Sequence, residues 1–418
     1  MGARINPSPR ESKPIGRAKA IKRAPHAAPN LALRRRAFRL EETMKVHHVA
    51  PHFHPERGGV EWNVLGLGRY LVDRGHEVVV HTSSRGIRGE TFPAIGMIDG
   101  IAIRRYRPLI HLGYYATVFR PDVRGADIVH LHGYGFLTND RAARGLHRTV
   151  PFVYSLHHGV SQPPPSLAAA LKWKAYYSLQ GRATLRRAAA IISGSVPDRD
   201  WLASRGFPLE RVHVVPTGLD PTAFRPGSPE RARSRFRLDR YVLFLGRLHR
   251  EKSPDHLVRA AADLGDWPGS FVFVGPDGGM RNFLETQASA LGLRDRVVFT
   301  GEVDEETKRD LLAGATCLVL PSFYEAQGIV ILEAWAQGIP VVASRVGGVP
   351  HLVSDGVDAL LFAWSDVAAV SRAIRRIIEN PTEAAEMGLA GRAKASSKFR
   401  WEILGPQVET IYEAAVRS

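Results

Sequence analysis

Short apolar runs, separated by polar loops that contain glycine, recur along the first half of the chain. Their continuous apolar character is typical of strands buried inside a parallel sheet. These runs are residues 46–50, 77–81, 128–131 and 152–156. The loop after the first run ends in Gly58-Gly59, and apolar residues then recur at helical spacing. Strand, loop and helix in this order predict a doubly wound α/β domain over residues 44–220.

The same pattern begins again at residue 241. The apolar runs of this second series are 241–245, 271–274, 297–299, 317–320 and 341–343. A helix is predicted from about Gly328 to Gln337, because Gly338 and Pro340 stop it. Residues 221–240 are rich in Pro and Arg and lack periodicity, which predicts a linker. We therefore expect a second α/β domain over residues 241–398.

Charge and composition narrow the class of protein. The net charge is +16, and residues 1–43 hold eleven Lys or Arg against three Glu, so half of the excess lies in this leader. Its composition predicts disorder, and it lacks the apolar core of a secretory signal. A transit peptide and a start site assigned too far upstream both stay open as explanations. No apolar run is long enough for a membrane-spanning helix, and the lone Cys317 forms no internal disulfide.

Four charged residues follow strands of the second series or begin its helices: Arg247, Lys252, Glu325 and Glu333. Because the carboxyl ends of parallel strands meet at one edge of a sheet, these side chains are expected to converge. Arg, Lys and the free amides at a helix start suit a pyrophosphate, and carboxylates accept hydrogen bonds from vicinal hydroxyls. Together they indicate a nucleotide-sugar. The simpler interpretation is a solvated loop pair, a capping carboxylate and an exposed helix residue.

The first domain offers glycines and histidines. The pair Gly58-Gly59 would let a ligand approach a helix N-terminus, although many strand–helix turns need such residues for packing alone. His130 and His132 share a face of a strand and suggest a metal site, with a further cluster at His47, His48, His52 and His54. No carboxylate is tied to them by spacing. Structural histidines at the edge of a pocket are therefore the preferred interpretation.

Several motifs, taken together, resemble glycosyltransferase family 4. They are Glu325-x7-Glu333 with Gly328, Glu333-Ala334, Gly338-x-Pro340, Gly347-Gly348, Gly246-Arg247 with Lys252, Pro216-x-Gly218-x-Asp220, Phe299-Thr-Gly301-x-Val303 and Gly58-Gly59. The resemblance covers about residues 45–418. It implies a GT-B fold, in which two Rossmann-like doubly wound α/β domains face each other across a cleft. Residues 399–418 would form a helix that crosses back to the N-terminal, acceptor-side domain.

The resemblance also implies roles for single residues. Arg247 and Lys252 would hold the donor diphosphate, Glu333 the ribose and Glu325 the hydroxyls of the donor sugar. His157 would face the sugar; His158 is the alternative residue for this role if the motif is aligned one position later. The remaining donor-binding residues would be Gly58, Gly59, Gly275, Val303, Gln327, Gly328, Ile329 and Val330.

The chain departs from the family pattern at four positions. Thr217 stands where Asn is usual, and His351 replaces a frequent Glu. Gln327 and Trp335 occupy positions that usually carry other residue types, which puts the sugar pocket in question.

The implied activity is retaining transfer of a hexosyl group from a UDP-sugar or GDP-sugar to a glycan or lipid-linked acceptor, without an obligatory metal or other cofactor. We expect a cytoplasmic protein without specific nucleic-acid binding. The basic, aromatic stretch Leu171–Tyr177 suggests peripheral contact with the inner face of a membrane, unless Trp173 and Tyr177 face the core. Two alternatives stay open. One is another GT-B activity, an inverting transferase or a sugar-nucleotide epimerase; the other is a non-catalytic basic protein that binds nucleic acid or anionic lipid.

Overall fold

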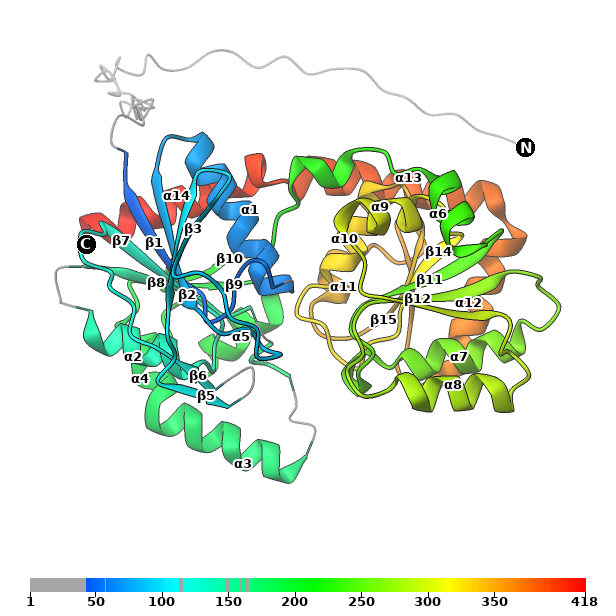
Figure 1. The fold of residues 1–418 in the computed structure, drawn as a ribbon, viewed down its shortest axis with the longest axis horizontal. Helices are drawn as coiled ribbons and strands as arrows, with labels where there is room; N and C mark the ends of the chain where they lie inside the picture. Colours follow the sequence, from blue (N-terminus) through cyan, green and yellow to red (C-terminus); the bar gives the residue numbers. More distant parts are fainter. Residues whose placement is uncertain (1–42, 57, 113–115, 147–149, 158, 163–165) are drawn as a thin grey trace, which may run out of the picture. The chain divides into compact units, whose positions relative to one another are not determined.

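The computed structural model describes residues 43–418 except 57, 113–115, 147–149, 158 and 163–165 (Figure 1). The basic leader and His158, the alternative residue for the sugar-facing role, lie outside the described residues. Within 43–418, two sheets follow one another along the chain. We refer to the part built on the first sheet as the N-lobe and to the part built on the second as the C-lobe.

The N-lobe contains an eight-stranded sheet in the order β10-β9-β8-β7-β1-β2-β4-β3. All neighbouring strands are parallel except β3 and β4. The strands are β1 (Lys45–Val49), β2 (Glu77–Ser83), β3 (Ile95–Ile98), β4 (Ile101–Tyr106), β7 (Ile128–His132), β8 (Phe152–Ser155), β9 (Ala190–Ser193) and β10 (Val212–Val214); β5 (Ile110–Leu112) and β6 (Ala116–Val118) form a separate hairpin. The helices are α1 (Gly59–Asp73), α2 (Leu137–Gly145), α3 (Leu167–Tyr176), the π-helical turn η1 (Tyr177–Gly181), α4 (Arg182–Arg187), α5 (Val196–Ala203) and the 3-10 turn η2 (Leu209–Arg211).

The C-lobe contains a six-stranded, fully parallel sheet in the order β13-β12-β11-β14-β15-β16. Its strands are β11 (Tyr241–Leu245), β12 (Ser270–Val274), β13 (Val297–Gly301), β14 (Cys317–Leu320), β15 (Val341–Ser344) and β16 (Leu360–Phe362). Its helices are η4 (Arg250–Lys252), α7 (Pro254–Asp263), α8 (Arg281–Ala290), α9 (Glu305–Ala313), α10 (Ile329–Ala336), α11 (Val349–Leu352), α12 (Val367–Glu379) and α13 (Pro381–Lys398).

Helices cover both faces of the C-lobe sheet (Figure 1). Alternate residues of a strand point to opposite faces, so Val242 and Phe244 pack toward α7, α8 and α12, whereas Leu243 and Leu245 pack toward α9 and α10. Each strand is therefore apolar on both sides. This explains the unbroken apolar runs of the sequence.

The segment predicted as a linker contains regular structure. Residues 221–240 hold η3 (Pro221–Phe224) and α6 (Pro229–Phe236), and α6 packs against α9. Ser228 caps α6, with Pro229 at its first position, and Arg231 forms an ion pair with Asp310 at 2.7 Å. The high Arg content hid this helix, because only Ala232 among its residues is buried.

Helix α14 (Trp401–Arg417) contributes Trp401, Leu404, Val408 and Tyr412 to the core of the N-lobe. It lies beside α1, β7 and β8 (Figure 1). Close packing depends on Gly66 of α1, where a Cβ would lie 2.1 Å from the Trp401 indole nitrogen. Among the described residues, no helix is both long and apolar enough to span a membrane.

Candidate active site

A cavity of about 1180 Å³ lies where the loops after the parallel strands of both lobes meet. All the predicted site residues line it: Gly58, Gly59, His157, Arg247, Lys252, Gly275, Val303, Glu325, Gln327, Gly328, Ile329, Val330 and Glu333. The convergence expected from the strand–loop–helix pattern is thus present, and the roles of the single residues remain predictions. The position at the carboxyl ends of the strands is the usual ligand site of open α/β sheets.

Lys252 and Glu325 form an ion pair at the wall of this cavity. The Lys252 Nζ donates to Glu325 Oε1 at 2.6 Å, and Ser322 Oγ donates to the same oxygen at 2.7 Å. Glu325 is only 9% exposed, so the pair is partly withdrawn from water and its attraction is stronger than that of a surface pair. Two donors on one oxygen hold the carboxylate in place. This arrangement suits an anchor for hydroxyl groups better than a mobile base.

Glycines let the neighbouring loop support Glu325. The Gly348 N–H donates to the Glu325 carbonyl oxygen at 2.9 Å. Gly347 adopts φ +53, and a Cβ there would lie 2.0 Å from that same carbonyl oxygen. The Gly347-Gly348 motif is therefore required by a close backbone approach, which fixes the position of the carboxylate.

Arg247 follows β11 on a loop that is also positioned by glycine. A Cβ on Gly275, which has φ +136, would lie 2.2 Å from the Gly246 carbonyl oxygen. Arg247 is exposed, and it makes no ion pair with any of the described residues. Its guanidinium is thus available to an anion that enters the cavity, whereas Lys252 is already paired.

Helix α10 points its N-terminus at the cavity. Gly328 begins it in the left-handed conformation, with φ +83, which a residue with a Cβ adopts only with strain. The amides of Ile329 and Val330 belong to the first turn, where N–H groups have no partner inside the helix. Together with the helix dipole they favour a negative charge at this point.

Glu333 has a partner that the sequence did not indicate. Lys308 of α9 donates to Glu333 Oε1 at 2.6 Å, contacts Glu305 Oε2 at 2.8 Å and lies 5.4 Å from the centre of the Trp62 ring. Burial opposes the charge of Lys308, but the two carboxylates outweigh burial and raise its pKa. A ribose bound by Glu333 would therefore share that carboxylate with a cation.

The N-lobe contributes fewer charges. A Cβ on Gly59 would lie 3.3 Å from Ile329 Cδ1, so this helix start closely approaches α10. Glu61, which the sequence analysis did not single out, also lines the cavity, and burial raises its pKa to about 7. The relevant signal in the sequence is a carboxylate two positions after Gly59, in the first turn of the helix.

His157 lies just beyond β8 with φ +57, a conformation that is uncommon for residues with a side chain and concentrates at functional sites. Its Nε2 lies 2.9 Å from His132 Nδ1.

Gln327 and Trp335, two of the departures from the family pattern, make contacts in different parts of the structure. Gln327 binds the backbone of Thr217, accepting from its N–H at 2.6 Å and donating to its carbonyl oxygen at 3.1 Å, and so joins the α10 loop to the end of the N-lobe. Trp335 is fully buried in the C-lobe core and donates to the Asp358 carbonyl oxygen at 2.8 Å. The concern that Trp335 alters the sugar pocket was wrong, because its side chain packs between α10 and α13 and not toward the cavity.

Three members of the predicted cluster of His47, His48, His52 and His54 contact different partners. His47 contacts His81, whereas His48 contacts His132, and His52 pairs with Glu56 at 3.0 Å. His130 and His132 do share a face of β7, with ring centres 3.9 Å apart, as expected for alternate residues of a strand.

Comparison with known proteins assigns the family. A family model described as Glycosyltransferase Family 4 matches residues 57–223, and one described as Glycosyl transferases group 1 matches residues 230–394. The D-inositol 3-phosphate glycosyltransferase of Acidothermus cellulolyticus is 30% identical over 89% of this chain and 90% of the relative. The enzyme of that name from Frankia alni is also 30% identical, over 88% of this chain and 98% of its own.

Solved structures share the fold. Sucrose-phosphate synthase from Thermosynechococcus elongatus has a TM-score of 0.70 and 22% identity, covering 88% of this chain and 98% of that one. Anabaena HepE in complex with UDP-glucose has a TM-score of 0.70 and 21% identity, covering 88% and 100%. The GT-B fold predicted from the motifs is confirmed. The chain belongs to glycosyltransferase family 4 and is a glycosyltransferase that uses nucleotide-sugar donors.

Proposed function

We propose that this protein transfers a hexosyl group, with retention of anomeric configuration, from a UDP-sugar or GDP-sugar to a neutral hydroxyl of a glycan or lipid-linked acceptor. No metal ion is obligatory in this proposal. The observation that carries it is the Lys252–Glu325 ion pair, which lies on the same cavity wall as Arg247 and the α10 N-terminus. These groups combine binding of phosphate with binding of hydroxyls.

The cations act on the leaving group. As the bond between sugar and phosphate breaks, negative charge grows on the diphosphate. Lys252 and the α10 amides are held in place before the reaction, and together with Arg247 they stabilise that charge as it develops. They supply the positive charge for which other transferases employ a divalent ion, so the site works without one.

Retention is supported by the state of Glu325. An inverting reaction needs a base that removes the proton of the acceptor hydroxyl. The Glu325 carboxylate is instead held through one oxygen by Lys252 and Ser322. It orients the hydroxyls of the sugar and leaves the attacking group to approach from the face of the departing phosphate.

The charge of the N-lobe wall favours a neutral acceptor. Among the described N-lobe residues that line the cavity, Arg88 is the one arginine or lysine. A guanidinium nitrogen of Arg88 lies 3.5 Å from a carboxylate oxygen of Glu302 in the C-lobe. Glu56, Glu61 and Glu90 line the same wall. Among the described residues of this wall, a phosphorylated acceptor would meet more negative than positive charge. D-inositol 3-phosphate, named in the similar relatives, is therefore the second candidate acceptor.

Peripheral membrane contact belongs to the same proposal. Trp173 and Tyr177 pack inward, against Tyr134 and Trp201, with ring centres 5.2 and 5.4 Å apart. The outer side of α3 and η1 instead exposes Leu167, Leu171 and Leu179, and Lys172 and Lys174 are also exposed. Apolar side chains beside lysines suit the interface of an anionic membrane.

A donor screen tests the proposal. We expect slow hydrolysis of one UDP-sugar or GDP-sugar in a panel of UDP-, GDP- and ADP-sugars, unaffected by EDTA, and a transfer product whose anomeric configuration by NMR equals that of the donor. Inversion would indicate the alternative GT-B transferase. If no nucleotide changes the melting temperature and the protein binds DNA in a salt-dependent way, the results would instead favour a non-catalytic basic protein that binds nucleic acid. Parallel reactions with D-inositol 3-phosphate and with neutral acceptors decide between the two acceptor classes.

A further inference from the structure

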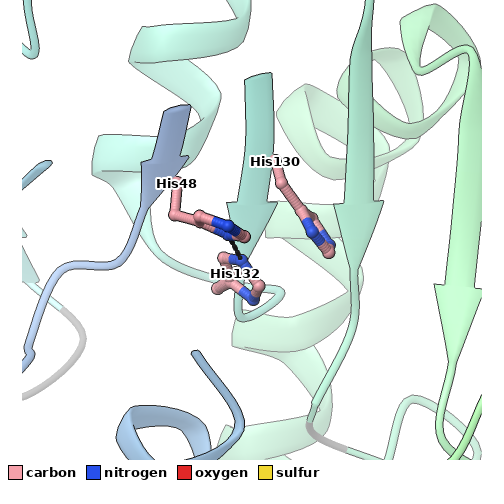
Figure 2. Close-up of side chains that lie close together, drawn as sticks. All are labelled: His48, His130 and His132. Atoms are coloured by element: carbon pink, nitrogen blue, oxygen red, sulfur yellow. Dashed lines mark hydrogen bonds between the residues drawn. The ribbon is translucent and has the colours of Figure 1, made fainter. Parts of the chain in front are cut away.

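Three histidines form a hydrogen-bonded chain that ends at the cavity. His48 Nδ1 lies 2.8 Å from His132 Nε2, and His132 Nδ1 lies 2.9 Å from His157 Nε2. Figure 2 shows the first of these bonds, with His130 beside it. The first two rings are fully buried, and His157 lines the cavity.

The register of the strands places the three histidines of this hydrogen-bonded chain next to one another. β1 and β7 are parallel neighbours in which His48 pairs with His130, so His48, His130 and His132 lie on one face of the sheet. β7 pairs with β8 such that His132 is opposite Ser155, two residues before His157. His130 packs against His132 and is held from both sides, with Tyr412 Oη at 2.6 Å and Ser155 Oγ at 2.7 Å.

The buried imidazoles are neutral. Burial, and secondarily the neighbouring His47, lowers the pKa of His48 to about 3. Burial and the adjacent histidines lower the pKa of His130 and His132 well below the ordinary value. A neutral imidazole carries one proton, so each of these buried rings has one nitrogen that can donate a hydrogen bond and one that can accept one.

The buried end of the chain sets its direction. His48 Nε2 is buried, and no hydrogen-bond partner for it is found among the described residues. A buried N–H without an acceptor is rarer and more costly than an unused acceptor. The His48 proton therefore lies on Nδ1 and is donated to His132 Nε2. His132 must then donate from Nδ1 to His157 Nε2, which leaves the His157 proton on Nδ1.

The same nitrogens would be the ligands of a metal ion, since one nitrogen from each of His48, His130 and His132 lies within 4.8 Å of the others. However, both nitrogens of His130 contact hydroxyls and both nitrogens of His132 contact imidazoles. A metal ion would have to replace these bonds. The arrangement fits a hydrogen-bonded chain better.

We propose that His48 and His132 are positioning residues that fix His157 as a hydrogen-bond acceptor at Nε2 and a donor at Nδ1 toward the nucleotide-sugar. This inference rests on the proposed function only for the ligand that His157 contacts. The direction of the chain is a property of the free protein and is measured without a substrate.

The test is the tautomer of His157 in protein labelled with ¹⁵N-histidine. Two-bond ¹H–¹⁵N spectra distinguish a proton on Nδ1 from one on Nε2, and the spectrum of His157→Asn assigns the signals. We expect the proton on Nδ1. His48→Leu removes the first donor, so it should convert His157 to a tautomer mixture and lower kcat/KM for donor hydrolysis about tenfold. His48→Asn keeps a side-chain N–H near the Nδ1 position and should restore both.

His81→Leu is the matched control. It removes a buried histidine from β2 that contacts His47 and Tyr106 and not the chain, so it should cost stability without changing the His157 tautomer. In the His157→Asn background, His48→Leu should lower kcat/KM no further.

A His157 proton on Nε2 in the unmodified protein would overturn the inference, as would stoichiometric zinc that is lost in His48→Leu. If no donor is hydrolysed but the His157 proton lies on Nδ1, the inferred direction of the histidine chain is confirmed and the proposed function is wrong. Should His48→Leu not fold, the tautomer of the unmodified protein still decides.

Discussion

The two lobes build their sides of the cavity from different chemistry. The C-lobe side presents ionic groups: Arg247, the pair Lys252–Glu325 and the pair Lys308–Glu333. The N-lobe side presents the hydrogen-bonded chain of His48, His132 and His157 and, within the part of the chain that the structure describes, few cations. Charge that must be balanced during the reaction is thus gathered on the donor side. The opposite side contributes hydrogen bonds of defined direction, and we expect substitutions on the two sides to fail in different ways.

The largest effect is expected from Lys252→Ala. Loss of one fixed cation beside the departing diphosphate should lower kcat/KM for donor hydrolysis by roughly 100-fold or more. Lys45→Ala, which removes an exposed lysine paired with Glu77 at 3.2 Å, is the control and should leave activity unchanged. Equal turnover of Lys252→Ala and the unmodified protein would contradict the assignment.

A further large effect is expected from Lys308→Met, and it should appear in the stability of the protein. It leaves Glu333 and Glu305 close together without their shared cation, and Lys308 is only 13% exposed. We expect a loss of about 2 kcal/mol in the free energy of unfolding, measured with urea. Adding Glu333→Gln should recover part of it. If the double variant is no more stable than the single one, the ion pair is not the cause.

Glu61→Gln tests a buried carboxyl of the N-lobe that lines the cavity. The pKa of Glu61 in the folded protein, about 7, exceeds the ordinary glutamate pKa of 4.5, so the folded protein binds the proton more tightly than the unfolded chain. Stability is then lost as the pH rises from about 4.5 to 7. Relative to the unmodified protein, the variant should gain roughly 3 kcal/mol in the free energy of unfolding over this interval and little more above it. Urea titrations at pH 4.5, 6 and 8 measure the difference in the free energy of unfolding between the variant and the unmodified protein. A difference that does not change with pH would contradict the raised pKa of Glu61.

The smallest effect concerns α3. Leu167→Glu with Leu171→Glu should reduce binding to vesicles that contain anionic lipid by severalfold, while donor hydrolysis stays the same. Leu389→Glu changes an equally exposed leucine on α13 and is the control for added charge. Co-sedimentation at two salt concentrations gives the measurement. Binding that is unaffected by the α3 substitutions would place membrane contact elsewhere.

The sequence predicted more of the C-lobe side than of the N-lobe side, for a physical reason. Arg247, Lys252 and Glu325 each follow a strand, so strand pattern and loop position together predicted that they meet. The pairing of Lys308 with Glu333 depends on how α9 packs beside α10, which short-range periodicity does not specify. The histidine chain depends on the register of β1, β7 and β8.

Two misjudgements have similar origins. Trp335 put the sugar pocket in question because it departs from the family pattern in the helix that carries Glu333. The two residues nevertheless lie on different faces of α10, and Gly391 of α13 leaves room for the indole. The α6 helix has no apolar periodicity because a single residue of it, Ala232, is fully buried, and the ion pair of Arg231 with Asp310 of α9 leaves no apolar pattern in the sequence.

Helix α14 has a consequence for synthesis of the protein. The N-lobe is made first, yet Trp401, Leu404 and Tyr412 complete its core, and the whole C-lobe lies between them and α1 in the sequence. During translation the nascent N-lobe therefore exposes an apolar face that no segment can yet cover, whereas the C-lobe sheet already has its own helices on both faces when it emerges. The lobe that leaves the ribosome first is the last to mature. Its open face is where we expect chaperones to act and where aggregation of the nascent chain would begin.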